Sequence, residues 1–528
     1  MKTYEKTNRR HFAAAITCTF LSSLCAVVLQ FLKGDVLDFA AAGNGLRALR
    51  SGGMLLALIL GECLFYFLFM RTSDRYAIGC ITGLRRDIFD SILRRSYLDY
   101  KSRPQGEYIA KLTTDAEAIR DKRFRMRTML WEILLKISFV TVALFRLDWR
   151  IALVTIALLT TPLYIPKLIE KPLQRAQTAY LQAMEDNLAK VTDWLSGFEI
   201  IKNFAIEGHI RRRYQRINDD AMEKLSIDTR LGAVSQLITT LISYLSYFIV
   251  LACAAWLVVR GDFSAGDFFV AIGMIDQLSW PLISLAGITR QLIAIRPTCE
   301  AMEEFLDVPA TSEQTPVTEL RRDIRFRDVS FSYDGVRSIL NGFDLTIRKG
   351  ERYLLKGPSG CGKTTAVNLL LKYFSPTSGS IELDGIPIET LGSTYGLMTV
   401  VRQEATLFAD TLRHNLTMYR DIPEDRLIST LKSVGLERFA DSLDQPVTEG
   451  GANFSGGEKK RICLARALLR DTDVLILDEP LANLDAATAE RIEDLLLTIP
   501  DKTLLVVSHQ FSPEKLHCFD RVIDLTNR

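Results

Sequence analysis

The segment Gly357-Pro358-Ser359-Gly360-Cys361-Gly362-Lys363-Thr364 decides the fold of the second part of this 528-residue chain. It matches the phosphate-binding pattern GxxxxGK(S/T) and lies between a strand-like run, 352–355, and a helix-like run, 365–373. Glycines let backbone N–H groups turn inward onto phosphate oxygens, and the N-terminus of the following helix adds a partial positive charge. We therefore expect the Lys363 ammonium to reach nucleotide phosphates and the Thr364 hydroxyl to bind Mg²⁺.

A second motif, Val474-Leu475-Ile476-Leu477-Asp478-Glu479, is an apolar run that ends in two carboxylates. Such a run is typical of a buried strand, and in phosphoryl-transfer enzymes its end lies beside the phosphate-binding loop. We expect Asp478 to hold Mg²⁺ through water and Glu479 to polarise the water that attacks the γ-phosphate. The two motifs together predict hydrolysis of a nucleoside triphosphate.

The sequence around these motifs indicates one domain preceded by a linker. Short β-rich runs alternate with helical patterns over 323–528, which predicts an α/β P-loop NTPase domain. Proline, serine and threonine residues mark 306–322 as the linker.

The region 1–305 instead contains six apolar stretches, each near the roughly 20 residues that span a bilayer. They lie at approximately 12–32, 52–71, 129–147, 149–169, 234–259 and 267–294. This pattern predicts an all-α six-helix transmembrane domain in a lipid bilayer. Lys and Arg precede the first stretch and are frequent in 71–127 and 170–230, so we expect those segments and both termini in the cytoplasm.

The two basic segments favour helix, so the membrane helices are expected to continue into the cytoplasm. The runs Ile109–Arg127 and Ala176–Lys190, for example, are charged but contain neither proline nor glycine. We therefore expect two long helical hairpins whose turns lie near 97–105 and 204–212.

The segment Phe454-Ser455-Gly456-Gly457-Glu458-Lys459-Lys460-Arg461 resembles LSGGQ, the signature sequence of the ATP-binding-cassette (ABC) transporters. With the other motifs it makes nearly the whole chain similar to the half-size exporters of that family. The resemblance implies an ABC nucleotide-binding domain that binds ATP and Mg²⁺ and hydrolyses ATP to drive transport. It also implies a dimer with a second half-transporter, because the signature of one subunit covers the ATP bound by the other.

The same resemblance implies roles for single residues. Tyr333 stacks on adenine, Gln403 links Mg²⁺ to the membrane domain, and His509 lies near the γ-phosphate. The implied catalytic residues are Lys363, Glu479 and His509, and the implied metal ligands are Thr364, Gln403 and Asp478. The other expected nucleotide contacts are Gly357, Pro358, Ser359, Gly360, Cys361, Gly362, Thr365, Ser455, Gly456, Gly457, Glu458 and Asp485.

Two departures from the family pattern stand out. Glu458 replaces the usual glutamine of the signature, and Leu481-Ala482-Asn483-Leu484-Asp485 differs from the common threonine-serine-alanine-leucine-aspartate. Asp485, the contact across the dimer, is retained. Because Lys363, Glu479 and His509 are all present, we expect a site that hydrolyses ATP.

Inside the apolar stretches, Glu62, Glu132, Lys136 and Asp276 are ionisable. A charge at membrane depth is unfavourable unless it faces a cavity or a partner. Glu132 and Lys136 are four residues apart on one helix, so we expect them to pair with each other. Glu62 and Asp276 lie nearer mid-membrane, where lining a substrate cavity and a purely structural role remain alternatives.

Taken together, the sequence favours an ATP-driven exporter of an amphipathic or lipophilic substrate (a peptide, drug or lipid) in the bacterial inner membrane. The alternatives are an importer of a metallophore-like substrate built on the exporter fold, and an ATP-gated channel or regulatory subunit. The net charge of +2 provides no basis for binding nucleic acid.

Overall fold

The computed structural model describes residues 1–159, 165–308, 316–358, 360–482 and 484–525. The chain divides into two compact units, Met1–Leu93 with Pro104–Val308, and Arg94–Arg103 with Pro309–Arg528. Four parts of the sequence expectations lie outside the described residues: 160–164 of the fourth apolar stretch, 309–315 of the linker, Ser359 and Asn483.

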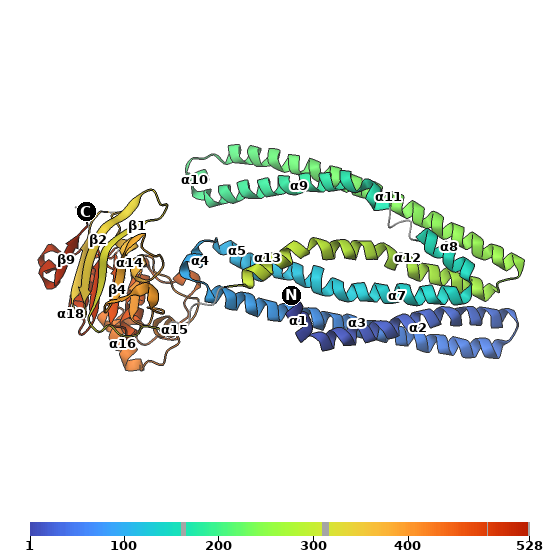
Figure 1. Ribbon diagram of the computed structural model, residues 1–528, viewed down its shortest axis with the longest axis horizontal. Helices are drawn as coiled ribbons and strands as arrows, with labels where there is room; N and C mark the ends of the chain where they lie inside the picture. Colours follow the sequence, from blue (N-terminus) through green and yellow to red (C-terminus); the bar gives the residue numbers. More distant parts are fainter. Residues whose placement is uncertain (160–164, 309–315, 359, 483, 526–528) are drawn as a thin grey trace. The chain divides into compact units, whose positions relative to one another are not determined.

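The first unit is helical (Figure 1). Its helices are α1 (Lys2–Thr7), α2 (Arg9–Ala41), α3 (Gly45–Arg94), α5 (Gln105–Ala110), α6 (Ala116–Ile119), α7 (Met126–Leu147), α8 (Trp149–Leu159), α9 (Ile165–Ser196), α10 (Phe198–Asn203), α11 (Glu207–Arg260), α12 (Ala265–Ala294) and α13 (Arg296–Leu306). Two π-helical turns, Lys111–Asp115 and Arg120–Arg125, join α5, α6 and α7 end to end.

Within the residues that the structure describes, five continuous helices are long and apolar enough to cross a membrane. They are Arg9–Ala41, Gly45–Arg94, Gln105–Leu147, Glu207–Arg260 and Ala265–Leu306. The fourth apolar stretch of the sequence begins as α8, a shorter apolar helix. Buried residues of α2, α7, α8, α11 and α12 form one apolar cluster, which includes Val27, Leu144, Ile151, Leu257 and Met274.

Helices α2 and α12 pack unusually closely because glycines face the contact. A Cβ atom on Gly34 would lie 2.6 Å from Val270 Cγ2, and one on Gly266 would lie 2.5 Å from the Gly34 carbonyl oxygen. Small residues allow such approach between membrane helices. Asp38 then accepts hydrogen bonds from the Ser264 hydroxyl (2.6 Å) and the Gly266 N–H (2.8 Å), so the end of α2 also fixes the start of α12.

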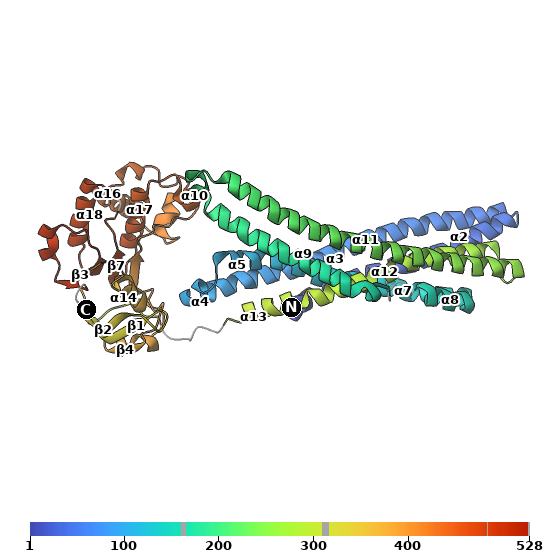
Figure 2. The same ribbon diagram turned by 90° about the horizontal axis from the view of Figure 1, so that it is seen from above.

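The long helices extend beyond their apolar segments and form hairpins. Helices α9 and α11 run side by side, with α10 at the turn that joins them (Figures 1 and 2). This turn spans 197–206, several residues before the range expected from sequence, because the helix already breaks at Gly197 and the apolar run 198–203 forms its own short helix. The other turn contains α4 (Tyr97–Lys101), whose first N–H groups are capped by the Ser96 hydroxyl.

The second unit is an α/β domain with two sheets. Its strands are β1 (Asp323–Ser332), β2 (Ser338–Arg348), β3 (Arg352–Lys356), β4 (Ser378–Leu383), β5 (Ile386–Pro387), β6 (Met398–Val401), β7 (Val474–Asp478), β8 (Thr503–Val507) and β9 (Arg521–Asp524). Its longer helices are α14 (Lys363–Leu370), α15 (Leu412–Thr417), α16 (Glu424–Ser433), α17 (Gly456–Leu469) and α18 (Ala486–Thr498). One sheet is antiparallel, in the order β2-β1-β4-β5, and the other is parallel, in the order β6-β7-β8-β3-β9.

The parallel sheet brings the two sequence motifs together. In register, Leu355 of β3 pairs with Val507 of β8, which pairs in turn with Asp478 of β7. The carboxyl ends of these strands therefore meet at one edge, where open α/β sheets bind their ligands. The central strands β7 and β8 are buried throughout, as is typical of parallel strands covered on both faces.

Candidate functional site

A cavity of about 740 Å³ opens at the carboxyl edge of the parallel sheet. Of the residues expected from sequence, it brings together Tyr333, Gly357, Pro358, Gly360, Gly362, Lys363, Thr364, Thr365, Gln403, Asp478, Glu479 and His509. It does not include Cys361 or the signature residues Ser455, Gly456, Gly457 and Glu458, nor Asp485. The site of this chain alone thus contains the phosphate-binding loop but lacks the signature.

The phosphate-binding loop takes a conformation that only glycine adopts easily. Gly360 and Gly362 have φ values of 85° and 97°, and a Cβ on Gly362 would lie 2.6 Å from Leu340 Cδ2. Lys363 begins α14, and its ammonium donates to the carbonyl oxygens of Gly357 (2.7 Å) and Pro358 (2.9 Å). The cation therefore lies across the loop, where phosphate oxygens can replace the carbonyls as its acceptors.

The expected magnesium ligands converge beside this loop. The Thr364 hydroxyl lies 3.4 Å from Asp478 Oδ2, and Gln403 lines the same cavity. Burial raises the pKa of Asp478, and Arg402, whose Nη1 lies 3.9 Å from the same oxygen, opposes that shift. Hydroxyl, carboxylate and amide oxygens are the hard ligands that Mg²⁺ prefers. The donor set therefore fits this ion.

Glu479 follows β7 with its backbone in the left-handed region (φ 53°). Its N–H still donates to the Val507 carbonyl oxygen (2.8 Å), so the backbone turns immediately after the strand. Its Oε1 lies 2.9 Å from His509 Nδ1, whereas Oε2 is buried without a hydrogen-bond partner among the described residues. An unpaired buried oxygen is unfavourable. It is therefore suited to accept a hydrogen bond from water or from a bound ligand.

Tyr333 presents an open aromatic surface at the cavity. Its ring packs edge-on against Phe331 (4.8 Å between centroids) and Phe374 (5.1 Å), while 54% of the residue stays exposed. Its hydroxyl lies 3.3 Å from Thr365 Oγ1. The ring is thus fixed by its neighbours and free to stack on a planar base.

The signature begins helix α17 and presents its first turn to solvent. Ser455 caps the helix by accepting from the Glu458 N–H (3.3 Å), and the Glu458 carboxylate accepts from the Ser455 N–H (2.8 Å). This capping box gives glutamate a structural role where the family usually has glutamine. No atom lies within 4 Å of the position that a Cβ on Gly456 would take. The helix N-terminus is therefore open to an anion from outside the chain.

Two family models match the chain. The model of the ABC transporter transmembrane region matches residues 12–282, and the ABC transporter model matches residues 340–482. The chain belongs to the ABC transporter family. It has the fused arrangement of a helical membrane domain and a nucleotide-binding domain that is found in the exporters of this family.

Similar proteins are spread over several kinds of ABC transporter. The chain is 28% identical to the uncharacterised ABC transporter ATP-binding protein YwjA of Bacillus subtilis, over 92% of this chain and 86% of that protein. It is 27% identical to an ATP-dependent lipid A-core flippase of Neisseria meningitidis, over 89% and 77%. The fold matches a bacterial Atm1-family ABC exporter with ATP bound, with a TM-score of 0.82 at 22% identity, over 98% and 93% of the two chains.

One buried residue of this ABC transporter was not identified by the motifs. The Lys460 ammonium on α17 donates to the carbonyl oxygens of Glu479 (2.7 Å) and Ala482 (2.9 Å). Burial lowers the pKa of Lys460, and the nearby carboxylates of Glu479 and Asp478 oppose that shift. Lys460 therefore ties the signature helix to the turn that carries Glu479. Its only sequence signal is a lysine on the buried face of an otherwise amphipathic helix.

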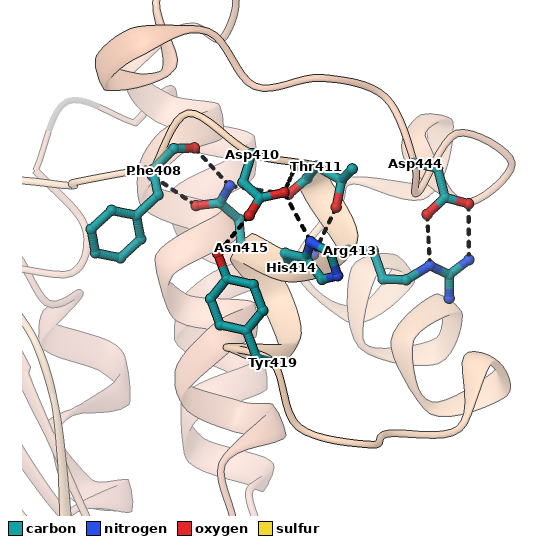
Figure 3. A network of polar contacts seen from close by, with 8 residues as sticks. All are labelled: Phe408, Asp410, Thr411, Arg413, His414, Asn415, Tyr419 and Asp444. Atoms are coloured by element: carbon teal, nitrogen blue, oxygen red, sulfur yellow. Dashed lines mark hydrogen bonds and ion pairs between the residues drawn. The ribbon is translucent and has the colours of Figure 1, made fainter. Parts of the chain in front are cut away.

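A polar network holds the segment that follows Gln403 (Figure 3). Asn415 of α15 accepts from the Phe408 N–H and donates to the Phe408 carbonyl oxygen, both at 2.9 Å. Asp410 accepts from Tyr419, His414 and the Thr411 N–H, and these bonds lower its pKa to about 2. Arg466 of α17 donates to the Asn415 carbonyl oxygen (2.7 Å). The transporter thus links this segment directly to its signature helix.

The turn that contains α4 packs in the same compact unit as the nucleotide-binding domain. The Tyr97 ring stacks on the Tyr373 ring, with centroids 3.8 Å apart and planes 16° apart. The Arg402 guanidinium lies 5.5 Å from the centroid of the Tyr373 ring, and its Nη1 lies 3.9 Å from Asp478 Oδ2. Contacts therefore run continuously from α4 to the side chain expected to hold Mg²⁺.

Proposed function

We propose that this ABC transporter hydrolyses MgATP in a dimer and uses the free energy to export an amphipathic or lipophilic substrate across a membrane. One observation carries the proposal. A single cavity contains the phosphate-binding loop, the Thr364–Asp478 pair and the Glu479–His509 pair, in a chain with five helices of membrane-spanning length.

Each residue of the cavity has a role in the proposed hydrolysis. Tyr333 stacks on adenine, and the loop N–H groups with Lys363 hold the phosphates. Thr364, Gln403 and Asp478 hold Mg²⁺, which when bound neutralises charge on the phosphates. Glu479 orients and polarises the attacking water, and His509, bonded to its Oε1, keeps the carboxylate in position and contacts the γ-phosphate.

Two observations support a dimer. The signature lies outside the chain's own cavity, with Gly456 open to solvent, so a second subunit must supply the signature that completes the site. Large apolar side chains are also exposed around the α9–α11 turn, including Phe198 (54%), Ile200 (59%) and Phe204 (73%). A second half-transporter, identical or different, would cover them.

Relatives favour export over the alternatives of import and channel gating. They include proteins described as a lipid A-core flippase and a putative multidrug export protein. We place the protein in the bacterial inner membrane, with both termini and the helical hairpins in the cytoplasm, because those segments carry the Lys and Arg residues. Uptake of substrate into inverted vesicles, dependent on MgATP, would demonstrate export.

The decisive test of the proposed hydrolysis is the Glu479→Gln variant. It removes the group that polarises water but none that cradles phosphate, so ATP turnover should fall by about 100-fold or more while ATP binding persists. The Glu490→Gln variant, altered on the exposed side of α18, is the matched control and should keep parental turnover. Near-parental turnover in Glu479→Gln would disprove the assignment.

A further inference from the structure

A second polar cavity lies inside the membrane unit. It has a volume of about 230 Å³ and is lined by residues of four helices: Ser23 and Ala26 of α2, Glu62 of α3, Lys136 and Val140 of α7, and Asp276, Gln277, Trp280 and Pro281 of α12. The Gln277 amide donates to the Ala26 carbonyl oxygen (3.0 Å), which fixes two of its walls. The cavity is smaller than a drug-sized pocket, so it suits the head group of a longer molecule.

The charges around this cavity do not cancel. Lys136 is already paired, because its Nζ lies 2.7 Å from Glu132 Oε1, which confirms the pairing expected from sequence. Neither Glu62 nor Asp276 makes a hydrogen bond or ion pair with another described residue. Lys136 also interacts electrostatically with Glu62, and Lys33 interacts with both Glu62 and Asp276, although Lys33 is exposed and does not line the cavity. The carboxylates of Glu62, Glu132 and Asp276 and the ammonium groups of Lys33 and Lys136 together carry a net charge of one negative unit.

A buried hydroxyl also lacks a partner in the cavity wall. Ser23 is only 1% exposed, and its Oγ makes no hydrogen bond with any part of the chain that the structure describes. A buried polar atom without a partner is unfavourable, and this hydroxyl has a free lone pair that can accept a hydrogen bond from a ligand as well as a proton that it can donate. The unpartnered hydroxyl is independent of the carboxylates, and it too indicates that a polar group of a ligand binds in this cavity.

The remaining walls are apolar. Ala26, Val140 and Pro281 line the cavity, and the indole of Trp280 lies on the same helix as Asp276, one turn further along. An indole face attracts organic cations as well as apolar groups. The cavity thus contains two carboxylates, an indole and an unpartnered hydroxyl. These groups together favour a cation that has N–H donors and an apolar body.

We propose that this cavity binds the protonated amine head group of an amphipathic substrate. Glu62 and Asp276 neutralise the ammonium, Ser23 accepts one of its N–H bonds, and Trp280 contacts the start of its apolar chain. The inference rests on the proposed export function, since it names the substrate class of the transported molecule. One positive charge on the ligand balances the one excess negative charge of the cavity.

The test measures binding of three radiolabelled probes to the full chain in lipid nanodiscs without nucleotide, after subtraction of empty nanodiscs. The probes are dodecylamine, dodecyltrimethylammonium and dodecanoate, which share one chain length but differ in charge and N–H donors. Dodecylamine should bind about tenfold or more tightly than dodecanoate, because the cavity repels an anion. Equal affinity for dodecylamine and dodecanoate would overturn the proposal, and so would absence of saturable binding.

Variants locate the site. Glu62→Gln and Asp276→Asn should each weaken dodecylamine binding by about tenfold, as expected for loss of a charged partner. Ser23→Ala should weaken dodecylamine by about threefold but leave dodecyltrimethylammonium unchanged, because that probe has no N–H to donate. The matched control is Asp35→Asn, which removes an exposed carboxylate of α2 outside the cavity and should bind like the parent.

The outcomes separate this inference from the proposed function. Each variant should retain ATP turnover, which shows that it has folded and that hydrolysis does not depend on the cavity. If ATP turnover is normal but the double variant Glu62→Gln/Asp276→Asn binds dodecylamine like the parent, the inference alone fails. If the parent hydrolyses no ATP yet prefers dodecylamine, the proposed function fails alone. Should a variant not fold, the three probes on the parent still decide.

Discussion

The nucleotide cavity and the membrane cavity are built on opposite principles. The first is formed at one sheet edge by short contiguous segments, and much of it is backbone held in left-handed turns, as at Gly362 and Glu479. The second is formed by single side chains that project from four helices. A site made of backbone tolerates little change, whereas a site made of side chains can change its ligand without change of fold. We infer that the first cavity carries the chemistry common to the family and the second the specificity of this member.

A substitution in the signature should separate the two cavities most clearly, because it should affect ATP turnover and leave ligand binding in the membrane cavity unchanged. Gly456→Asp adds a negative charge where the partner's γ-phosphate must approach, although the position has room for a side chain. ATP turnover should fall by about 100-fold or more, while ATP binding to the variant's own loop changes little. Dodecylamine binding in the membrane cavity should remain parental.

The control for this charge effect is Gly456→Asn, which has nearly the same size and no charge. It should lose less turnover than Gly456→Asp, since only the steric part of the change remains. If Gly456→Asp loses ATP binding and hydrolysis together, the signature acts within its own chain, and the shared site of the dimer is wrong.

A smaller effect is expected from Lys460, which links the signature helix to the turn of Glu479. Lys460→Met keeps the length of the side chain but leaves two carbonyl oxygens without their donor, at a cost of about 1–3 kcal/mol for a buried group. We expect a lower midpoint of thermal unfolding and about tenfold slower ATP turnover, because Glu479 loses its backbone support.

Measurement of unfolding and turnover on the same samples distinguishes positioning from stability. The matched control is Lys432→Met on α16, whose side chain is exposed, and it should alter neither property. A Lys460→Met variant that is destabilised but turns over ATP at the parental rate would show that Lys460 only supports the fold.

The smallest effect is expected at Cys361, inside the phosphate-binding loop. Its thiol is half-buried and lies 3.8 Å from the Lys363 ammonium, so alkylation would displace the loop that holds phosphate. A maleimide should inhibit ATP turnover, and MgATP added first should protect. Cys361→Ser should keep turnover within about twofold of the parent and resist the reagent, since serine is close to cysteine in size.

Eight other cysteines offer other targets for the reagent, because all nine are free thiols. Full sensitivity of an active Cys361→Ser variant would therefore assign the inhibition to one of them.

The motifs of the nucleotide-binding domain could be predicted because each is a short stretch with a local physical cause. The strand before the glycine loop and the apolar strand before Asp478 both lie where the sequence placed them. The α9–α11 turn was placed too late because charged helical patterns do not show where a hairpin reverses, whereas Gly197 marks the break in the structure. Lys460 was missed because no pattern tells which carbonyl oxygens a buried lysine will meet.

The sequence by itself determined the family, the two kinds of domain and the motifs that line the cavity of the second unit, because these depend on neighbours in the chain and on composition. Only the tertiary structure decided that Ser23, Glu62 and Asp276 share one cavity. The physical reason is that helical periodicity assigns a residue to a face of its own helix. The sequence does not say which other helices that face contacts, because this depends on close packing between distant segments, such as Gly34 against Gly266.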